Sequence, residues 1–502
     1  MDGRRRAGWA AGGTTGTAHG SGRGAVREHG LDDRWRGCGW QRDAGAALAI
    51  AWPRAARQRR AHRELRARPR RGHRGRRRPA RCAPRTRTRR AGRDPARHRA
   101  ARRGDHDDGR DRERGLTPSP TPHVTSDSVV DADVVIVGAG VIGLAVAAEL
   151  ARTHSVVLVE RHEAYARETS SHNSGVIHAG IYYATGSLKH RLCIAGNPAL
   201  YAWCEAHHVT ARRTGKLIVA LDGDRDGALD AVLQQARANA VPSIEALTAA
   251  EARAMEPEVP ATAALYSGST GIVDAIGYAR SLEAAARAAG ALLAYRHEVR
   301  RVERLNDTFR LEVSDPDGAV STVRCAALVN AAGHGAPALA ASLGYSLDGD
   351  ATKPPLRQHA NRGRYYDVVA PEFARAISRP VYPLPRHDLG GLGVHLTIDT
   401  DGSLHLGPDA EWLPDDAALD YRSDDARRDE FLASAQRLLP RLRAEDIAPG
   451  QVGYRPKRNA AGEPEADFLI WHNRGYVHLG GIESPGLTAS LPIAAEVARL
   501  LR

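Results

Sequence analysis

The sequence predicts an α/β fold with a parallel sheet, into which a segment rich in antiparallel strands is inserted. Residues 134–137 form a short, wholly apolar run, which is typical of a strand buried on both faces of a parallel sheet. A glycine turn, a helical pattern and a second apolar run at 156–159 follow directly. Between 351 and 447, by contrast, short strands alternate with Pro, Gly and Asp turns, which is typical of an antiparallel sheet.

The glycine turn after the first strand has the spacing of a dinucleotide-binding site. Gly138 allows the tight turn, Gly140 lets the backbone approach a pyrophosphate, and Gly143 lets helix and strand pack closely. The helix that follows directs free N–H groups and the positive end of its dipole at the phosphates. Glu160, at the end of the second strand, can accept hydrogen bonds from a ribose. The sequence therefore predicts a dinucleotide site, and a glycine turn in an unrelated α/β fold is the alternative.

The later elements continue the mixture of helices and strands. Helical patterns occur at 187–207, 226–240, 278–289 and 485–501. Strand patterns occur at 216–221, 291–295, 309–313, 327–330 and 476–479. Because only distant segments together can complete the parallel sheet, we expect a discontinuous domain of residues 131–215, 270–350 and 448–502, with 216–269 and 351–447 forming the second domain.

The N-terminal segment differs sharply from this body. Residues 1–115 contain 34 Arg, no Lys and 12 Asp or Glu, whereas the remainder has 38 basic and 47 acidic residues. A segment of Arg, Ala and Gly without periodicity buries too little apolar surface to fold, so we expect residues 1–125 to be disordered. A nucleic-acid-binding arm and a targeting peptide are two interpretations of it.

A third interpretation, which we favour, is that the true start lies near Val124 or Val129 and the upstream residues are a meaningless translation. The abundance of Arg without any Lys and the abrupt start of the folded pattern support it. No Met occurs between Met1 and Met255, so such a start would use a codon other than ATG.

The composition of the body argues against several classes of protein. Its mild excess of acidic residues makes a nucleic-acid partner unexpected for the folded part. None of the five cysteines has metal-ligand spacing, so no metal site is expected, and their sparseness fits a reducing compartment. No run of about 20 apolar residues occurs, so no membrane span is expected. We expect a cytoplasmic protein. Peripheral contact with the inner face of the membrane is the alternative.

Several longer motifs occur in the order found in a known family. They include Ser-Ser-His-Asn-Ser-Gly at 170–175 and Gly-Ile-Glu-Ser-Pro-Gly-Leu-Thr-Ala-Ser at 481–490. The full set covers residues 170–183, 212–220, 271–274, 391–397, 407–412, 454–457 and 481–490. These motifs resemble the FAD-dependent D-amino-acid-oxidase-like superfamily and, within it, the L-2-hydroxyglutarate dehydrogenase/oxidase family. The resemblance covers residues 131–502.

The resemblance implies a Rossmann-like FAD-binding domain with an inserted antiparallel-sheet (α+β) substrate domain, and FAD rather than NAD between them. It places Gly138, Gly140 and Gly143 at the pyrophosphate and Glu160 at the adenosine ribose. The second flavin loop would contain Ser170, Ser171, His172, Asn173 and Gly175, and a later strand would end in Gly333. The C-terminal loop would contribute Gly481, Gly486, Leu487 and Thr488 to stabilise charge on the reduced flavin. An ordinary helix cap is the alternative interpretation of this last loop.

The chemistry that the resemblance implies needs a base and a cation. Oxidation of a 2-hydroxy acid moves a hydride to flavin N5 and the hydroxyl proton to a base, for which His178 and His395 are the candidates. Arg455 and Lys457 are candidates for binding a carboxylate, with a surface salt bridge as the alternative for each. Tyr183, with its neighbour Tyr182, could close over the substrate or simply pack.

Two further points bear on the substrate. The extra basic and polar residues at 357–361, before Arg-Gly-Arg-Tyr-Tyr at 362–366, depart from the pattern of the resembled family and could accommodate a different acid side chain. Arg364 could contact a carboxylate, although a solvated strand residue is the expected interpretation. The leading function is FAD-dependent oxidation of a 2-hydroxy acid, with L-2-hydroxyglutarate as the best candidate. An amine or amino-acid oxidase of the same fold, a flavin-fold protein without catalysis and nucleic-acid binding through the basic arm are the alternatives. Dioxygen, a quinone and a soluble carrier are all open as electron acceptor.

Overall fold

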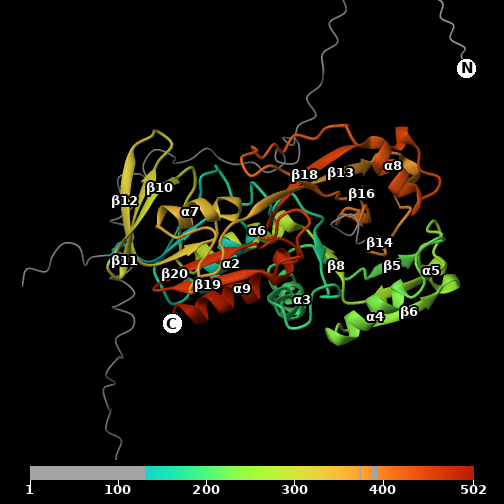
Figure 1. Ribbon diagram of the computed structural model, residues 1–502, viewed down its shortest axis with the longest axis horizontal. Helices are drawn as coiled ribbons and strands as arrows, with labels where there is room; N and C mark the ends of the chain where they lie inside the picture. Colours follow the sequence, from blue (N-terminus) through green and yellow to red (C-terminus); the bar gives the residue numbers. More distant parts are fainter. Residues whose placement is uncertain (1–129, 374, 386–392) are drawn as a thin grey trace, which may run out of the picture. The chain divides into compact units, whose positions relative to one another are not determined.

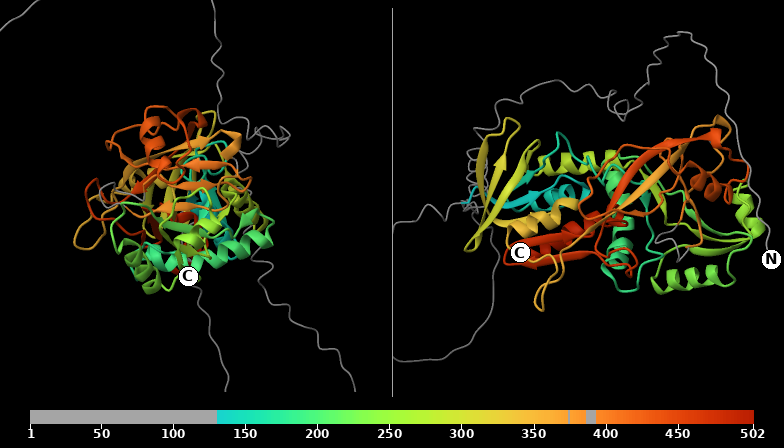
Figure 2. Two further views of the ribbon diagram at one scale, coloured as in Figure 1. Left: turned by 90° about the vertical axis from the view of Figure 1, so that its right-hand side faces the viewer. Right: turned by 45° about the horizontal axis from the view of Figure 1, so that its top comes forward.

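The described part of the chain contains two large sheets. A computed structural model describes residues 130–373, 375–385 and 393–502. The Arg-rich segment and the start sites considered above lie outside the described residues. Figures 1 and 2 show the first sheet and its helices at one end of the described body, the second sheet at the other end, and α3 between them.

The first sheet has a parallel centre, as the sequence predicts. The strand order is β10-β11-β12-β1-β2-β9, and β20 also pairs with β12. Parallel pairing joins β20, β12, β1, β2 and β9, while β10, β11 and β12 form an antiparallel meander and β19 pairs antiparallel with β20. Its strands are β1 Ala132–Val137, β2 Val156–Val159, β9 Leu292–Ala294, β10 Glu298–Leu305, β11 Thr308–Ser314, β12 Val320–Asn330, β19 Leu469–Asn473 and β20 Tyr476–Gly480.

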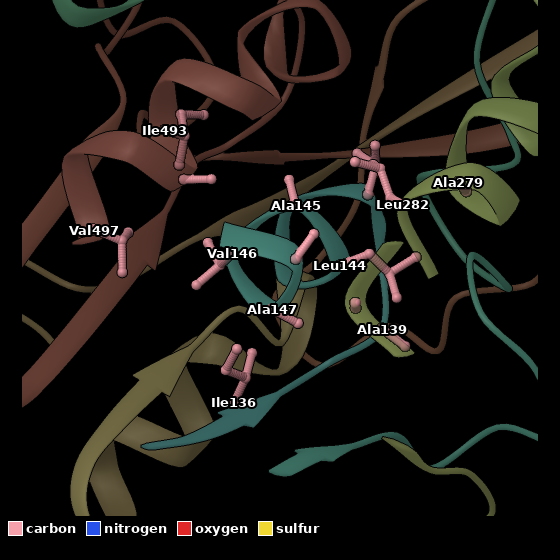
Figure 3. Close-up of a cluster of buried hydrophobic side chains, with 14 of the residues drawn as sticks. Ile136, Ala139, Leu144, Ala145, Val146, Ala147, Ala279, Leu282, Ile493 and Val497 are labelled. Carbon is pink, nitrogen blue, oxygen red and sulfur yellow. The ribbon is translucent and has the colours of Figure 1, made fainter. Parts of the chain in front are cut away.

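Three helices pack together beside this sheet. They are α2 (Val141–Leu150), α6 (Ala275–Ala288) and α9 (Gly486–Leu500). Eight of the ten residues of α2 are buried, which suits a helix that is apolar on all sides and surrounded by other elements. Figure 3 shows side chains of α2 between those of α6 and α9. The helices α3 (Leu188–Ala206) and α7 (Ala336–Ser342) complete this half.

The second sheet is largely antiparallel, as the sequence predicts for the inserted segment. Its order is β17-β13-β16-β15-β14-β5-β7-β6, with β18 paired to β13, and β14 with β5 is the parallel pair. The strands are β5 Lys216–Ala220, β6 Ile244–Thr248, β7 Ala263–Ser267, β13 His359–Val368, β14 Val381–Pro383, β15 Leu396–Ile398, β16 Leu404–Leu406, β17 Glu411–Trp412 and β18 Ile447–Lys457. The helices of this half are α4 Ala228–Ala238, α5 Ala249–Met255 and α8 Arg428–Gln436.

The described residues also form a small third sheet. The small sheet has the order β3-β8-β4, from Val176–Ile177, Gly271–Val273 and Ala211–Arg212. Residues 448–457 were expected in the first domain, whereas β18 pairs along its length with β13 in the second sheet. This difference arises because strand pairing joins segments that are far apart in the chain. The local sequence of a strand therefore does not determine which sheet the strand joins.

Candidate functional site

A cavity of about 1450 Å³ is lined by residues of both large sheets. Its volume exceeds the roughly 300–1,000 Å³ that holds a drug-sized ligand, so it has room for a dinucleotide together with a small substrate. Most of the residues singled out in the sequence line it: Gly138, Gly140, Glu160, Ser170, His172, Asn173, His178, Tyr183, Gly333, His395, Arg455, Lys457, Gly486 and Leu487. The remaining ones, Gly143, Ser171, Gly175, Gly481 and Thr488, lie behind this wall.

The turn after β1 accepts only glycine at two positions. Gly138 has φ +104°, and a Cβ there would lie 2.5 Å from the carbonyl oxygen of Ala331. A Cβ on Gly143 would lie 2.0 Å from the carbonyl oxygen of Gly138. The glycines thus bring the start of α2 against the turn, and the first N–H groups of α2, which lack acceptors within the helix, lie at the cavity wall.

Glu160 joins the end of β2 to this turn. Its Oε2 accepts a hydrogen bond from the backbone N–H of Ala139 at 2.7 Å, and its Oε1 accepts one from the N–H of His162 at 2.9 Å. Each carboxylate oxygen can accept a further bond. Glu160 therefore holds the glycine turn in place and still offers acceptor capacity to the cavity, which it lines.

The loop at 168–175 is attached directly to the same turn. Ser170 Oγ accepts a hydrogen bond from the N–H of Val141 at 3.0 Å, at the start of α2. Asn173 shapes the loop, because its Oδ1 accepts from the N–H of Gly175 at 2.9 Å and its Nδ2 donates to the carbonyl of Ser170 at 3.0 Å. Ser171 Oγ donates to the carbonyl of Glu168. Two loops predicted separately thus form one continuous wall.

The C-terminal loop faces the cavity from the other side. Gly481 has φ +63°, and α9 begins at Gly486, which lines the cavity together with Leu487. Thr488 Oγ1 accepts a hydrogen bond from the backbone N–H of His178 at 3.0 Å. This bond ties the first turn of α9 to the segment that carries the candidate base.

Both candidate histidines line the cavity in their neutral forms. Burial, together with the nearby Lys216 charge, lowers the pKa of His178 to about 3 and that of His395 to about 3. His395 Nδ1 lies 2.9 Å from the carbonyl oxygen of Gly393 and donates to it, which leaves Nε2 as the acceptor. The Nε2 of His178 lies 3.2 Å from Ser484 Oγ.

The two candidate cations have different surroundings. Arg455 donates from Nη1 to Asn361 Oδ1 at 2.7 Å and from Nη2 to the carbonyl oxygen of Asp409 at 3.1 Å. No carboxylate of the described residues lies within ion-pair distance of its guanidinium. Lys457 lies 2.7 Å from Glu465 Oε2 and 3.0 Å from Glu483 Oε1, so two carboxylates already engage its ammonium group. Arg455 is therefore the cation available to a bound anion.

Arg364 differs from the expected solvated residue. It is 6% exposed and forms ion pairs with Asp409, at 2.9 Å, and with Glu411. It lies within a run of four buried residues of β13, and a buried arginine requires such partners. Its charge is accordingly neutralised within the protein.

The family follows from the extent of a sequence match. The model of the DAO family, described as FAD dependent oxidoreductase, matches residues 133–500. The chain belongs to this family. It is 35% identical over 410 residues to the mitochondrial L-2-hydroxyglutarate dehydrogenase of Arabidopsis thaliana, covering 73% of this chain and 82% of the relative. It is 28% identical over 402 residues to the L-2-hydroxyglutarate dehydrogenase of Escherichia coli strain K12, covering 73% and 92%.

Solved structures agree on the fold of this FAD-dependent oxidoreductase. L-alpha-glycerophosphate oxidase from Mycoplasma pneumoniae, with FAD bound, matches with TM-score 0.64 and 28% identity, over 74% of this chain and 94% of that one. Glycine oxidase from Geobacillus kaustophilus matches with TM-score 0.60 and 25% identity, over the same shares.

The residues of this FAD-dependent oxidoreductase fit its cofactor. The cavity is large enough for a dinucleotide, its wall contains a turn that excludes side chains, and the N-terminal turns of α2 and α9 both lie there. A carboxylate with spare acceptor capacity adjoins the first turn. These are the features that a pyrophosphate, a ribose and a flavin ring require.

One buried residue next to the cavity of this oxidoreductase, Lys216, was not singled out in the sequence. It is 1% exposed, and its Nζ lies 4.9 Å from the ring centroid of Tyr182 and 4.3 Å from that of Tyr382. The motif at 212–220 contains it, but a lysine at the start of a strand is usually exposed. The side chains next to its ammonium group, Tyr182 and Tyr382, come from other segments of the chain.

Within 130–373, 375–385 and 393–502, no group of three or more His, Cys, Asp or Glu side chains is placed to hold a metal ion. In the same residues, no helix combines the length and the apolar character needed to cross a bilayer.

Proposed function

We propose that this FAD-dependent oxidoreductase oxidises a 2-hydroxy acid to the corresponding 2-oxo acid, with L-2-hydroxyglutarate as its substrate. The observation that carries the proposal is that Arg455, free of any carboxylate partner in the described residues, lines the same cavity as two neutral histidines. A fixed cation selects an acid, and a neutral imidazole can accept its hydroxyl proton. The names of the relatives at 35% and 28% identity point to the same substrate.

Arg455 would bind a substrate carboxylate. Its bonds to Asn361 and to the Asp409 carbonyl hold the guanidinium plane in one orientation. A preoriented fork can donate two parallel hydrogen bonds to a carboxylate, which fixes the direction of the substrate as well as its charge. Lys457, by contrast, would serve to hold the C-terminal loop through Glu483.

His395 would act as the base. Its Nδ1–H donates to the Gly393 carbonyl, so Nε2 presents its lone pair and the low pKa keeps the ring neutral at physiological pH. When bound, FAD supplies the acceptor for the hydride that leaves the substrate carbon. His178, whose Nε2 lies beside Ser484, would help to hold the C-terminal loop, and Tyr183 would cover the substrate.

The cofactor would be held by the glycine turn after β1, by the loop at 170–175 and by the C-terminal loop before α9. We assign the pyrophosphate to Gly138, Gly140 and Gly143, and the ribose to Glu160. The loop at 170–175 and Gly333 would contact the cofactor from the first sheet, and Gly481, Gly486, Leu487 and Thr488 from the C-terminal loop. In this assignment the first sheet forms the cofactor domain and the second sheet the substrate domain.

The deciding experiment is an absorbance spectrum of the purified flavoprotein before and after anaerobic addition of L-2-hydroxyglutarate. Loss of the oxidised-flavin band with this acid, and no loss with D-2-hydroxyglutarate, glutamate, sarcosine or glycine, is the expected result. Reduction by glutamate, sarcosine or glycine instead would favour an amine or amino-acid oxidase, the second candidate, which the match to glycine oxidase supports. Reoxidation in air or by a quinone then distinguishes the electron acceptors.

A further inference from the structure

Lys216 is a buried cation without a counter-ion in the described part of the chain. It lies at the start of β5 with 1% of its surface exposed. Two tyrosine rings flank its ammonium group, at 4.9 Å and 4.3 Å from Nζ to the ring centroids. No described carboxylate lies within ion-pair distance of it. Because ring faces compensate only part of the lost hydration, burial lowers the pKa of Lys216 to about 7.

The groups that face Lys216 come from four segments around it. The segment after β3 contributes His178 and Tyr182, β14 contributes Tyr382, and the start of the β15 hairpin contributes His395. From α3 comes the thiol of Cys193, whose pKa burial raises to about 12, so that it is uncharged. None of these groups is anionic at neutral pH.

These neighbours separate Lys216 from the cavity by a single layer of side chains. His178, Tyr182, Tyr382 and His395 all line the cavity, whereas Lys216 itself does not. An anion in the cavity would therefore be the first negative charge close to this ammonium group. Conversely, the Lys216 charge lowers the pKa of both His178 and His395, after burial itself.

We propose that Lys216 is a positioning residue, which takes up a proton when a carboxylate ligand enters the cavity and then supplies a positive charge behind the cavity wall. The proposal rests on the proposed function, because that function makes the ligand a carboxylate. In the empty site the unpaired ammonium group loses its proton readily. A bound carboxylate supplies the missing counter-charge, so ligand binding and protonation of Lys216 favour each other.

Calorimetry with glutarate, a dicarboxylate that lacks the oxidisable hydroxyl, tests this coupling on the FAD-loaded full chain. Titrations at pH 7.5 in two buffers of different ionisation enthalpy give the number of protons taken up. The wild-type protein should take up a few tenths of a proton, and its affinity for glutarate should fall several-fold between pH 7 and pH 9. Both effects should vanish in Lys216→Met, which never carries the charge, and in Lys216→Arg, which always does.

The controls separate this inference from the proposed function. Lys353→Met, which removes an exposed lysine paired with Asp350, should behave as wild type. Lys216→Arg should keep the higher affinity at pH 9, a rescue that a merely structural role would not produce. Glutarate binding with equal proton uptake in wild type and Lys216→Met would overturn the role of Lys216 while leaving the proposed function intact. If the wild type binds no carboxylate at all, the proposed function fails and the coupling fails with it.

A potentiometric titration without ligand gives a second, independent readout. The difference in bound protons between the folded wild type and Lys216→Met should show one group with a midpoint near pH 7. A midpoint near the ordinary lysine value of about 10.4 would overturn the inference, whatever the ligand experiments give.

Discussion

At the scale of single residues, Arg455 should decide substrate affinity. Replacing it with Met removes the hydrogen-bonded cation, and bonds to charged groups contribute about 1.5–3 kcal/mol, so KM for the hydroxy acid should rise about 10- to 100-fold. Arg455→Lys should recover only part of this loss because it cannot form the fork. Steady-state kinetics of both variants, with the exposed Arg422→Met as control, measure the effect. An unchanged KM in Arg455→Met would contradict the assignment.

His395 is the second residue whose role can be tested directly. His395→Asn removes the base and should lower the rate of flavin reduction by about 10²–10⁴-fold, since general-base catalysis contributes about this much. The FAD content should stay unchanged. Stopped-flow reduction of this variant beside His178→Asn distinguishes the two candidates, and a larger loss in His178→Asn would assign the base to His178.

Most residues singled out in the sequence line one cavity, but the sequence did not predict their partners. Glycine spacing identified the turn, because a backbone position with no room for a Cβ requires glycine, which is visible in the sequence. The pairing of Lys457 with Glu465 and Glu483, and the burial of Arg364, depend on chain segments that meet only in the folded protein. Lys216 was missed for the same reason, because the rings next to its ammonium group, Tyr182 and Tyr382, come from distant segments.

At the scale of elements, the contact between the β1 turn and α2 should tolerate no side chain. Gly143→Ala would place a Cβ 2.0 Å from the Gly138 carbonyl oxygen, and this backbone atom cannot move without displacing the turn. We expect a lower thermal midpoint and loss of bound FAD, measured by flavin fluorescence during heating. Gly268→Ala is the control, because Gly268 does not line the cavity and the nearest atom to its new Cβ is the side-chain Cβ of Ser243, at 3.1 Å. Equal FAD retention in both variants would contradict this prediction.

The packing of β13, β15 and β16 contains an interaction that depends on pH. His405 Nδ1 lies 2.7 Å from Asp367 Oδ1, and Nε2 lies 3.1 Å from Asp399 Oδ2. Burial lowers the pKa of His405, but the hydrogen bond to Asp367 and the ion pair with Asp399 outweigh it and raise the pKa to about 9. A raised pKa means that the stabilisation is complete below the unfolded value of about 6.5 and is lost as the pH rises through 9.

This interaction should be visible in the thermal stability of the flavoprotein. Because both carboxylates are partly exposed, we expect it to contribute about 1–2 kcal/mol, less than the pKa shift alone implies. The melting midpoint of the wild type, relative to His405→Gln, should therefore be highest near pH 6 and should converge with that of the variant above pH 9. A constant difference between the two across this range would contradict the prediction.

The element boundaries show which features of the fold a local pattern can predict. The apolar strands and the glycine turn of the first sheet were predicted well, because burial on both faces leaves a continuous apolar run. The sheet to which β18 belongs was not predicted, since Ile447–Lys457 has no regular alternation of buried and exposed residues. Its partner β13 lies about 90 residues earlier, and only their pairing decides the matter.

At the scale of the whole molecule, the family match and the cavity make a prediction about the chain's N-terminal segment. The match begins at residue 133, and every residue that lines the cavity lies between 137 and 487. A chain that starts at Val124 should therefore bind FAD in equal proportion and turn over the hydroxy acid at the wild-type rate. Flavin absorbance per polypeptide and steady-state turnover of the two purified proteins test this. Retention of FAD with a large fall in turnover would show that the first 123 residues contribute to catalysis, whereas loss of FAD would show that they stabilise the cofactor fold.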